Sequence, residues 1–198
     1  MKHLLRDYLR KHVRSGGGPD FTTIEYKYGK FILYAIIDSD GNIIHLTFAP
    51  AKHVSAKMRL SGLGFDVNFA PMPQRESSFY ALFHDYFRGR LTRFPIVINS
   101  PFIESGTAFQ KRVWQNIQTI PYGKRITYRE LARMSGVPSG VRSVGTACGA
   151  NPLALIIPCH RVVAINGLGG FAGGIAVKEA LLQLEESWDS NLSGQAGD

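Results

Sequence analysis

Cysteine is scarce in this chain, with 2 residues among 198, and no long apolar run is present. Two cysteines cannot build a disulfide framework, and no Cys/His cluster has the spacing of a zinc finger. The six histidines are scattered along the sequence, so we expect no metal site. No segment approaches the roughly 18–20 apolar residues of a membrane span. We therefore expect a cytoplasmic protein, nucleoid-associated in a prokaryote, that binds no membrane and keeps its thiols reduced.

Acidic residues are also in the minority. The 23 Lys and Arg residues exceed the 15 Asp and Glu residues and give a net charge of +8. Such an excess favours polyanionic partners, with nucleic acid ahead of anionic membranes. Residues 1–14 are basic too, but their apolar positions Leu5, Tyr8, Leu9 and Val13 fall on one helical face. This spacing predicts a packed amphipathic helix rather than a targeting segment.

The residues up to 98 predict a first domain built on a small antiparallel sheet. Runs rich in β-branched and aromatic residues predict strands, and a Ser-Asp-Gly-Asn turn joins the second strand to the third. A stripe of aromatic residues at helical spacing predicts a helix whose apolar face belongs to the core. The expected elements are strands at 22–28, 30–37 and 43–48, a helix at 76–88 and a returning strand at 94–98.

The chain beyond a proline-containing linker at 99–106 predicts a mainly helical second domain, residues 107–189. Thr107 and Thr127 stand where helix caps are expected. A short helix from Thr127 and a second one at about 139–150, joined by a glycine-containing turn, predict a helix-turn-helix. We expect a final helix at 175–186 and a disordered tail at 190–198. The fold class is thus α+β.

The second helix of this helix-turn-helix carries unusually small side chains. Recognition helices that enter the major groove usually present Arg, Asn or Gln to the base edges. Small residues instead let a helix backbone approach closely, which suits the minor groove, with an arginine to fill space in the base stack. Tight packing of the helix inside the protein explains them equally well. The small residues are Ser143, Gly145, Thr146 and Ala147, and the arginine is Arg142.

A reactive cysteine is the strongest chemical candidate in the sequence. Cys159 follows an apolar run and a proline, and His160 and Arg161 come directly after it. A thiolate, the reactive form of cysteine, is stabilised by such neighbours. Because adjacent side chains diverge, His160 would take the thiol proton through water, and Glu185 or Glu186 would orient its ring. By spacing alone, a structural cysteine beside a satisfied histidine is the competing interpretation, and Cys148 is interpreted as a buried small hydrophobe.

A set of short motifs carries a resemblance to a known family. They are Gly-Thr-Ala-Phe-Gln at 106–110, Val-Trp at 113–114, Ile-Pro-Tyr-Gly at 120–123, Thr-Tyr at 127–128, Val-Arg-Ser-Val-Gly at 141–145, Asn-Pro at 151–152, Ile-Pro-Cys-His-Arg-Val at 157–162, Gly-Gly at 173–174 and Lys-Glu at 178–179. Together they resemble the C-terminal domain of the O6-alkylguanine-DNA alkyltransferases, which repair DNA by direct reversal. The resemblance implies a winged-helix-like C-terminal domain. The N-terminal half matches only in pattern, as a ribonuclease-H-like sheet with helices.

The resemblance implies a role for each matching residue. Cys159 would accept the alkyl group, His160 would deprotonate it through water, and Glu185 would polarise His160. Asn151 would tie the helix-turn-helix to the active-site turn, Tyr128 would help protonate the departing guanine, and Lys178 would support the site electrostatically. Arg142 would replace the flipped nucleotide. DNA contacts would also come from Thr127, Tyr128, Ser143, Gly145, Thr146, Ala147 and Arg161, and the base pocket from Val162, Phe171, Ala172 and Trp114.

The implied activity is stoichiometric repair of duplex DNA. A monomer would bind the minor groove with little sequence specificity, flip out O6-alkylguanine or O4-alkylthymine, and transfer the alkyl group irreversibly to Cys159. No cofactor is implied. The chain departs from many relatives at Phe171-Ala172, where they carry Tyr-Ser, and it lacks the N-terminal zinc site of some.

Three alternatives stay open at this point. The chain would bind lesions without removing them if it were an alkyltransferase-like protein, although those relatives lack the reactive cysteine. As a helix-turn-helix regulator it would sense alkylation or redox state through Cys159. As a Cys-His hydrolase it would need a direct Cys–His contact, which the adjacent pair disfavours.

Overall fold

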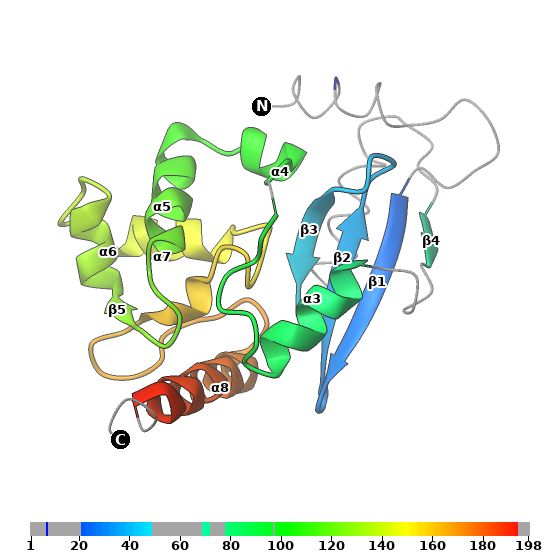
Figure 1. The fold of residues 1–198 in the computed structure, drawn as a ribbon. Helices are drawn as coiled ribbons and strands as arrows, with labels where there is room; N and C mark the ends of the chain where they lie inside the picture. The colour runs from blue at the N-terminus through cyan, green and yellow to red at the C-terminus, as the bar shows by residue number, and fades with distance from the viewer. Residues whose placement is uncertain (1–6, 8–20, 49–68, 72–77, 97, 194–198) are drawn as a thin grey trace.

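In the computed structural model, the described part of the N-terminal half is a four-stranded sheet with a helix packed against it (Figure 1). The structure describes residues 7, 21–48, 69–71, 78–96 and 98–193. The strands β1 (Phe21–Tyr28), β2 (Phe31–Ile37) and β3 (Ile43–Thr47) form the antiparallel meander expected from the sequence. A short β4 (Phe69–Pro71) pairs in parallel with β1, which gives the order β3-β2-β1-β4.

The helix α3 (Ser78–Phe87) packs its aromatic stripe onto this sheet, as predicted. Phe83, Tyr86 and Phe87 are buried, and the ring of Phe87 stacks on those of Tyr26 and Tyr28 from β1. Aromatic pairs of this kind add stabilisation beyond the area they bury. The stripe therefore fixes α3, including the direction in which Tyr86 points, on the first domain.

The C-terminal half is helical, and Figure 1 shows α5, α6 and α7 on the side of the molecule away from the sheet. Thr107 and Thr127 both form capping boxes, which satisfy the free amides at the start of a helix. The helix-turn-helix prediction is confirmed by α6 and α7. The elements are α4 (Pro101–Glu104), α5 (Ala108–Gln118), β5 (Ile126–Thr127), α6 (Tyr128–Met134), α7 (Val141–Gly149), a 3₁₀ turn η2 (Cys159–Arg161), β6 (Val162–Val163) and α8 (Ile175–Ser193).

Three expectations from the sequence are corrected. Residues 94–96 and 98 form no strand, and within the linker at 99–106 lies α4, with Pro101 at its start and Phe102 buried. The helix α8 continues to Ser193, into the segment predicted as a disordered tail. The predicted helix at 1–14 lies outside the described residues, apart from Asp7. The prediction of an α+β fold is confirmed. In the described part of the chain, none of the helices has the length and apolar character to cross a membrane.

The two halves are joined by backbone hydrogen bonds next to the helix-turn-helix. The amide of Leu46 in β3 donates to the carbonyl oxygen of Pro152 over 2.8 Å, and the carbonyl of Leu46 accepts from the amide of Ala154 over 2.9 Å. The Ser100 hydroxyl donates to the carbonyl oxygen of Ile44 over 2.6 Å. The sheet thus supports the segment that leads from α7 to Cys159.

Candidate active site

A pocket of about 390 Å³ opens where α7, η2 and the loop at 170–172 meet. Cys159 lies in its wall and is only 7% exposed. The pocket brings together six residues that the sequence predicted for the site and one, Cys148, that it assigned to the core. Its lining consists of Tyr128, Val141, Arg142, Gly145, Cys148, Gly149, Cys159, Gly170, Phe171 and Ala172.

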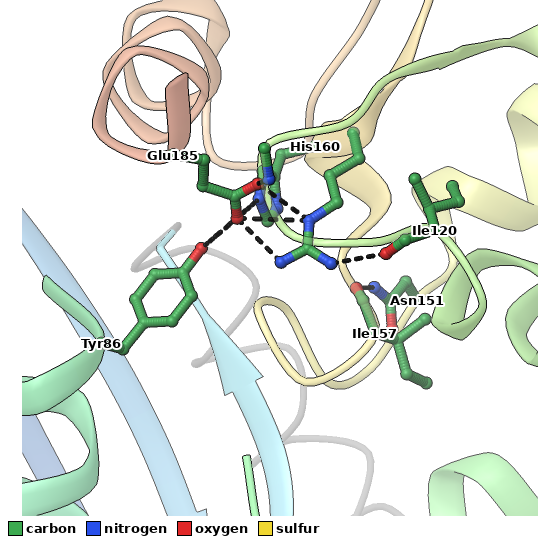
Figure 2. Close-up of polar contacts among 8 residues, drawn as sticks. Tyr86, Ile120, Asn151, Ile157, His160 and Glu185 are labelled. Carbon is green, nitrogen blue, oxygen red and sulfur yellow. Dashed lines mark hydrogen bonds and ion pairs between the residues drawn. The ribbon is translucent and has the colours of Figure 1, made fainter. Parts of the chain in front are cut away.

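Asn151 connects the end of α7 to the turn that carries Cys159. Its side-chain amide donates to the carbonyl oxygen of Ile157 over 2.7 Å (Figure 2). The same amide donates toward Sγ of Cys159 over 3.2 Å. Its oxygen accepts a hydrogen bond from the amide of Leu153 over 3.0 Å. All the polar groups of this side chain are thus used to hold the Cys159 turn in place.

His160 is fully buried and is oriented by a carboxylate. Its Nε2 lies 2.8 Å from Oε1 of Glu185 on α8. Since an ionised carboxylate only accepts hydrogen bonds, the neutral ring carries its proton on Nε2. The other nitrogen, Nδ1, has no hydrogen-bond partner among the residues that the structure describes. Burial lowers the pKa of His160, and the nearby Glu185 opposes this only in part, so the ring is kept neutral with a free lone pair.

Glu185 is the centre of a buried network of hydrogen-bond donors (Figure 2). Arg161 donates from Nε to Oε2 and from Nη2 to Oε1, each over 2.9 Å, and the amide of Gly123 donates over 3.1 Å. The hydroxyl of Tyr86 donates to Oε1 over 2.7 Å. Burial raises the pKa of Glu185, but the hydrogen bonds and charges of His160 and Arg161 outweigh it and lower that pKa to about 2. The carboxylate is therefore ionised at every physiological pH.

The predicted DNA contact of Arg161 is wrong. Its guanidinium is buried, paired with Glu185, and donates from Nη1 to the carbonyl oxygen of Ile120 over 2.7 Å. A charge in that position is compensated internally and has no access to a phosphate. The turn η2 directs the side chains of residues 160 and 161 inward together.

Tyr128 and Lys178 meet at the back of the pocket. The Tyr128 hydroxyl donates to the carbonyl oxygen of Gly170 over 3.1 Å, and burial raises the pKa of Tyr128 to about 12. Lys178 is fully buried, and its Nζ donates to the carbonyl oxygens of Val162 over 2.5 Å and Gly170 over 3.3 Å. Burial lowers the pKa of Lys178 to about 8. The carbonyl of Val162, a residue predicted for the base pocket, is thus engaged by Lys178, and Val162 does not line the pocket.

The outer face of α7 is open. Arg142, Ser143 and Thr146 are exposed, and a Cβ added at Gly145 or Gly149 would meet no described atom within 4 Å. Internal packing therefore does not require these two glycines, which favours the interpretation of a surface made for close approach.

Ala147 and Trp114 face the interior instead, which corrects their predicted places at the DNA surface and in the base pocket. Ala147 is 2% exposed, and its carbonyl oxygen accepts a hydrogen bond from Nε1 of Trp114 over 2.9 Å. Trp114, 3% exposed, packs behind α7 and does not line the pocket. The remaining predicted residue, Thr127, is held as the cap of α6.

The sequence did not predict two residues of the site, Tyr86 and Cys148. Tyr86 stands within an aromatic stripe that reads as ordinary core, and 99 residues separate it from Glu185. Cys148 lines the same pocket as Cys159, but burial raises the pKa of its thiol to about 12 and keeps it neutral. No local pattern distinguishes either residue from a core residue.

Comparisons of the sequence and of the structure with known proteins indicate the same protein family. The family model of the 6-O-methylguanine DNA methyltransferase, DNA binding domain, matches residues 108–187. A methylated-DNA–protein-cysteine methyltransferase of Mycobacterium bovis is 40% identical over 160 residues, which cover 79% of this chain and 93% of the relative. One from Methanosarcina acetivorans is 47% identical over 103 residues, covering 52% and 64% of the two chains.

Solved structures agree with these sequence relatives. The O6-methylguanine methyltransferase of Mycobacterium tuberculosis has a TM-score of 0.69 at 33% identity, over 84% of this chain and 93% of that one. A structure of the M. tuberculosis protein in complex with DNA covers 84% of this chain and 94% of that one, also at a TM-score of 0.69 and 33% identity. By sequence, fold and pocket together, the chain belongs to the methylated-DNA–protein-cysteine methyltransferase family.

Proposed function

We propose that this protein removes alkyl groups from O6-alkylguanine, and from O4-alkylthymine, by transferring them to Cys159, one group per protein molecule. The observation that carries the proposal is the position of Cys159. Its thiol lines a pocket of about 390 Å³, is held by Asn151 and is followed by a buried His160 that Glu185 orients. The names of the related enzymes support the same reaction class.

The transfer follows from the protonation states of these groups. His160 takes the thiol proton at Nδ1 through a water molecule, since Nε2 already donates to Glu185. The thiolate attacks the alkyl carbon, a C–S bond forms, and the C–O bond breaks with its electron pair passing to the guanine. The Tyr128 hydroxyl, which now donates to Gly170, turns to the departing base and supplies the proton. Lys178, which donates to the same Gly170 carbonyl, stabilises the negative charge left on the Tyr128 oxygen.

The reaction is limited to one turnover because its product is a thioether, which water does not hydrolyse under mild conditions. No metal or organic cofactor is needed, since the thiolate is the nucleophile and guanine is the leaving group. Phe171 and Ala172 line the pocket where the base would lie, with the Phe171 ring edge-on to His160 at 6.5 Å between centroids. The alkylated protein is spent.

The open face of α7 is the proposed contact with the minor groove. Ser143 and Thr146 are exposed on this face, and a Cβ at Gly145 would meet no described atom within 4 Å. These small residues allow the helix to approach the DNA backbone without reading base edges. Arg142, exposed at the rim of the pocket, fills the space of the flipped nucleotide. Flipping is required because the reacting atom is inaccessible in the base stack. A monomer with little sequence specificity is sufficient for this mode of binding.

The proposal is tested with a duplex carrying one O6-methylguanine. We expect the purified chain to gain the mass of one methyl group on Cys159, Cys159→Ala to bind the duplex without gaining it, and Cys148→Ala still to gain it. Methylation at Cys148, or more than one transfer per chain, would overturn the mechanism. Lesion binding without transfer by the unmodified chain would instead indicate an alkyltransferase-like binding protein, and sequence-specific binding controlled by Cys159 would indicate a regulator.

A further inference from the structure

We infer that Tyr86, a residue of the N-terminal half, is a positioning residue for the transfer step, acting through Glu185 on His160. The inference rests on the proposed function, in which His160 is the base. It assigns to the first domain an indirect part in the chemistry of the second. Tyr86 does not touch the pocket or the reacting atoms; its effect is carried by the carboxylate.

The contact itself is short and buried. The Tyr86 hydroxyl donates to Oε1 of Glu185 over 2.7 Å, and the same oxygen lies 2.8 Å from Nε2 of His160 (Figure 2). The hydroxyl is also 3.5 Å from that nitrogen. Both Tyr86 and Glu185 are 1% exposed. Because a hydrogen bond to a charged group in such surroundings is stronger than one in water, the phenol competes directly with the imidazole for one carboxylate oxygen.

The first domain fixes the direction of this hydroxyl. The Tyr86 ring is stacked on Phe94, with centroids 5.3 Å apart, and meets Phe87 edge-on at 5.3 Å. Burial and the neighbouring Glu185 raise the pKa of Tyr86 well above its ordinary value, so its hydroxyl stays a donor. A rigid donor on α3 therefore sets where the carboxylate from α8 lies, and hence where the ring of His160 lies.

The charged and titratable groups around Glu185 show what Tyr86 adds. His160 and Arg161 donate to the same carboxylate, Gly123 donates from its backbone, and the ring of Tyr122 lies nearby against Arg161. His160 and Arg161 together keep the carboxylate ionised. The hydroxyl of Tyr86 instead draws negative charge away from Oε1, the oxygen that polarises His160. Without it, Oε1 stabilises the imidazolium more strongly and the pKa of His160 rises.

Tyr86→Phe is the direct test, since it removes the hydroxyl and keeps the ring in the core. Tyr122→Phe is the matched control, because the Tyr122 hydroxyl is buried and has no hydrogen-bond partner among the described residues. Single-turnover transfer from saturating methylated duplex gives the rate, and titration of the duplex gives the affinity. For Tyr86→Phe we expect a transfer rate about 3- to 10-fold lower, the range for one hydrogen bond, with unchanged affinity for DNA. Tyr122→Phe should transfer at the wild-type rate.

The pH profile and a double-mutant cycle separate positioning from a merely structural role. We expect the acid limb of the rate profile to move to higher pH in Tyr86→Phe, because a more basic His160 is protonated sooner. In a Glu185→Gln background the same change should have little further effect, because residues that act through one another are not additive. A Tyr86→Phe protein with the wild-type rate and acid limb would overturn the inference, even if it were less stable. Failure of the wild-type chain to transfer would count against the proposed function instead.

Discussion

The side-chain amide of Asn151 and the thiol of Cys159 lie 3.2 Å apart, with the amide as donor. The same amide donates to the carbonyl oxygen of Ile157, and the Asn151 oxygen accepts from Leu153. A donor aimed at sulfur favours the thiolate over the thiol, because hydrogen bonding stabilises the charged form. Since Asn151 follows Ala150, the C-cap residue of α7, the nucleophile and the proposed DNA-binding helix share one support.

Replacing Asn151 is expected to affect both stability and transfer. Asn151→Ala leaves the polar groups of Ile157 and Leu153 without their side-chain partner, which costs about 1–3 kcal/mol in the free energy of unfolding. Asn151→Asp keeps the acceptor for Leu153 but places a negative charge toward the thiolate, so its transfer should be slower than that of Asn151→Ala. Urea unfolding and single-turnover transfer measure the two effects. Equal transfer rates for Asp and Ala would argue against a charge effect at Cys159.

Arg142→Ala tests the proposed nucleotide replacement. Arg142 is exposed, so the free energy of unfolding should change by no more than about 0.5 kcal/mol. Transfer from a methylated duplex should become much slower, whereas transfer from a single strand with the same lesion, where no stack has to be filled, should change far less. Arg90→Ala removes an exposed arginine from the other half of the molecule and controls for net charge. An equal loss with both DNA substrates would point to a simple phosphate contact.

Local features of the sequence predicted much of the fold. The capping threonines, the glycine-containing turn and the β-branched and aromatic runs of β1 to β3 depend on neighbours within a few residues, and these elements formed as expected. The linker prediction missed α4 because proline, which breaks a helix interior, is also well suited to the first helical position. The family resemblance named Cys159, Tyr128, Arg142, Phe171 and Ala172 for separate roles, and the structure places all five in the lining of one pocket.

Long-range packing decided the rest. Arg161 directly follows His160 and, by sequence alone, looks like a basic residue available to DNA. In the fold, Glu185 of α8 accepts a hydrogen bond from its guanidinium and holds that side chain inward. The indole of Trp114 is directed away from the pocket because the carbonyl oxygen of Ala147 accepts its N–H. Tyr86 looks identical in the sequence to the core aromatics around it, and only the tertiary fold brings its hydroxyl to Glu185. A sequence pattern gives the face of a helix but not the partner that covers it.

Glu185 should make the protein sensitive to acid. Its pKa in the folded protein is about 2, below the ordinary 4.5, so its stabilisation is present above pH 4.5 and is lost as pH falls toward 2. The pKa of His160 is also lowered in the folded protein, so the free energy of unfolding falls further as the pH drops below the ordinary His value of 6.5. Urea unfolding of the wild type at about pH 5 and about pH 3 measures the fall.

Two variants show whether this acid sensitivity belongs to Glu185. Glu185→Gln leaves Arg161 buried without its charge partner and should cost about 3–5 kcal/mol at neutral pH, with a smaller further loss in acid. Glu186→Gln, which removes the exposed partner of Arg125, should lose little and keep the steep acid dependence. The assignment fails if Glu185→Gln and the wild type lose the same free energy between the two pH values.

The buried Lys178 should make the free energy of unfolding increase with pH in mild base. A lysine whose pKa is raised in the folded protein has the opposite effect. Its pKa in the folded protein is about 8, below the ordinary 10.5, because burial penalises the ammonium. Between these two values the unfolded chain binds more protons than the folded one, so the free energy of unfolding rises with pH. The difference in that free energy between wild type and Lys178→Met should therefore grow from about pH 8 to about pH 10. Lys124→Met, at an exposed position, controls for the removal of a lysine as such. A difference that stays constant or shrinks over this range would mean that the hydrogen bonds to Val162 and Gly170 compensate the ammonium fully inside the protein.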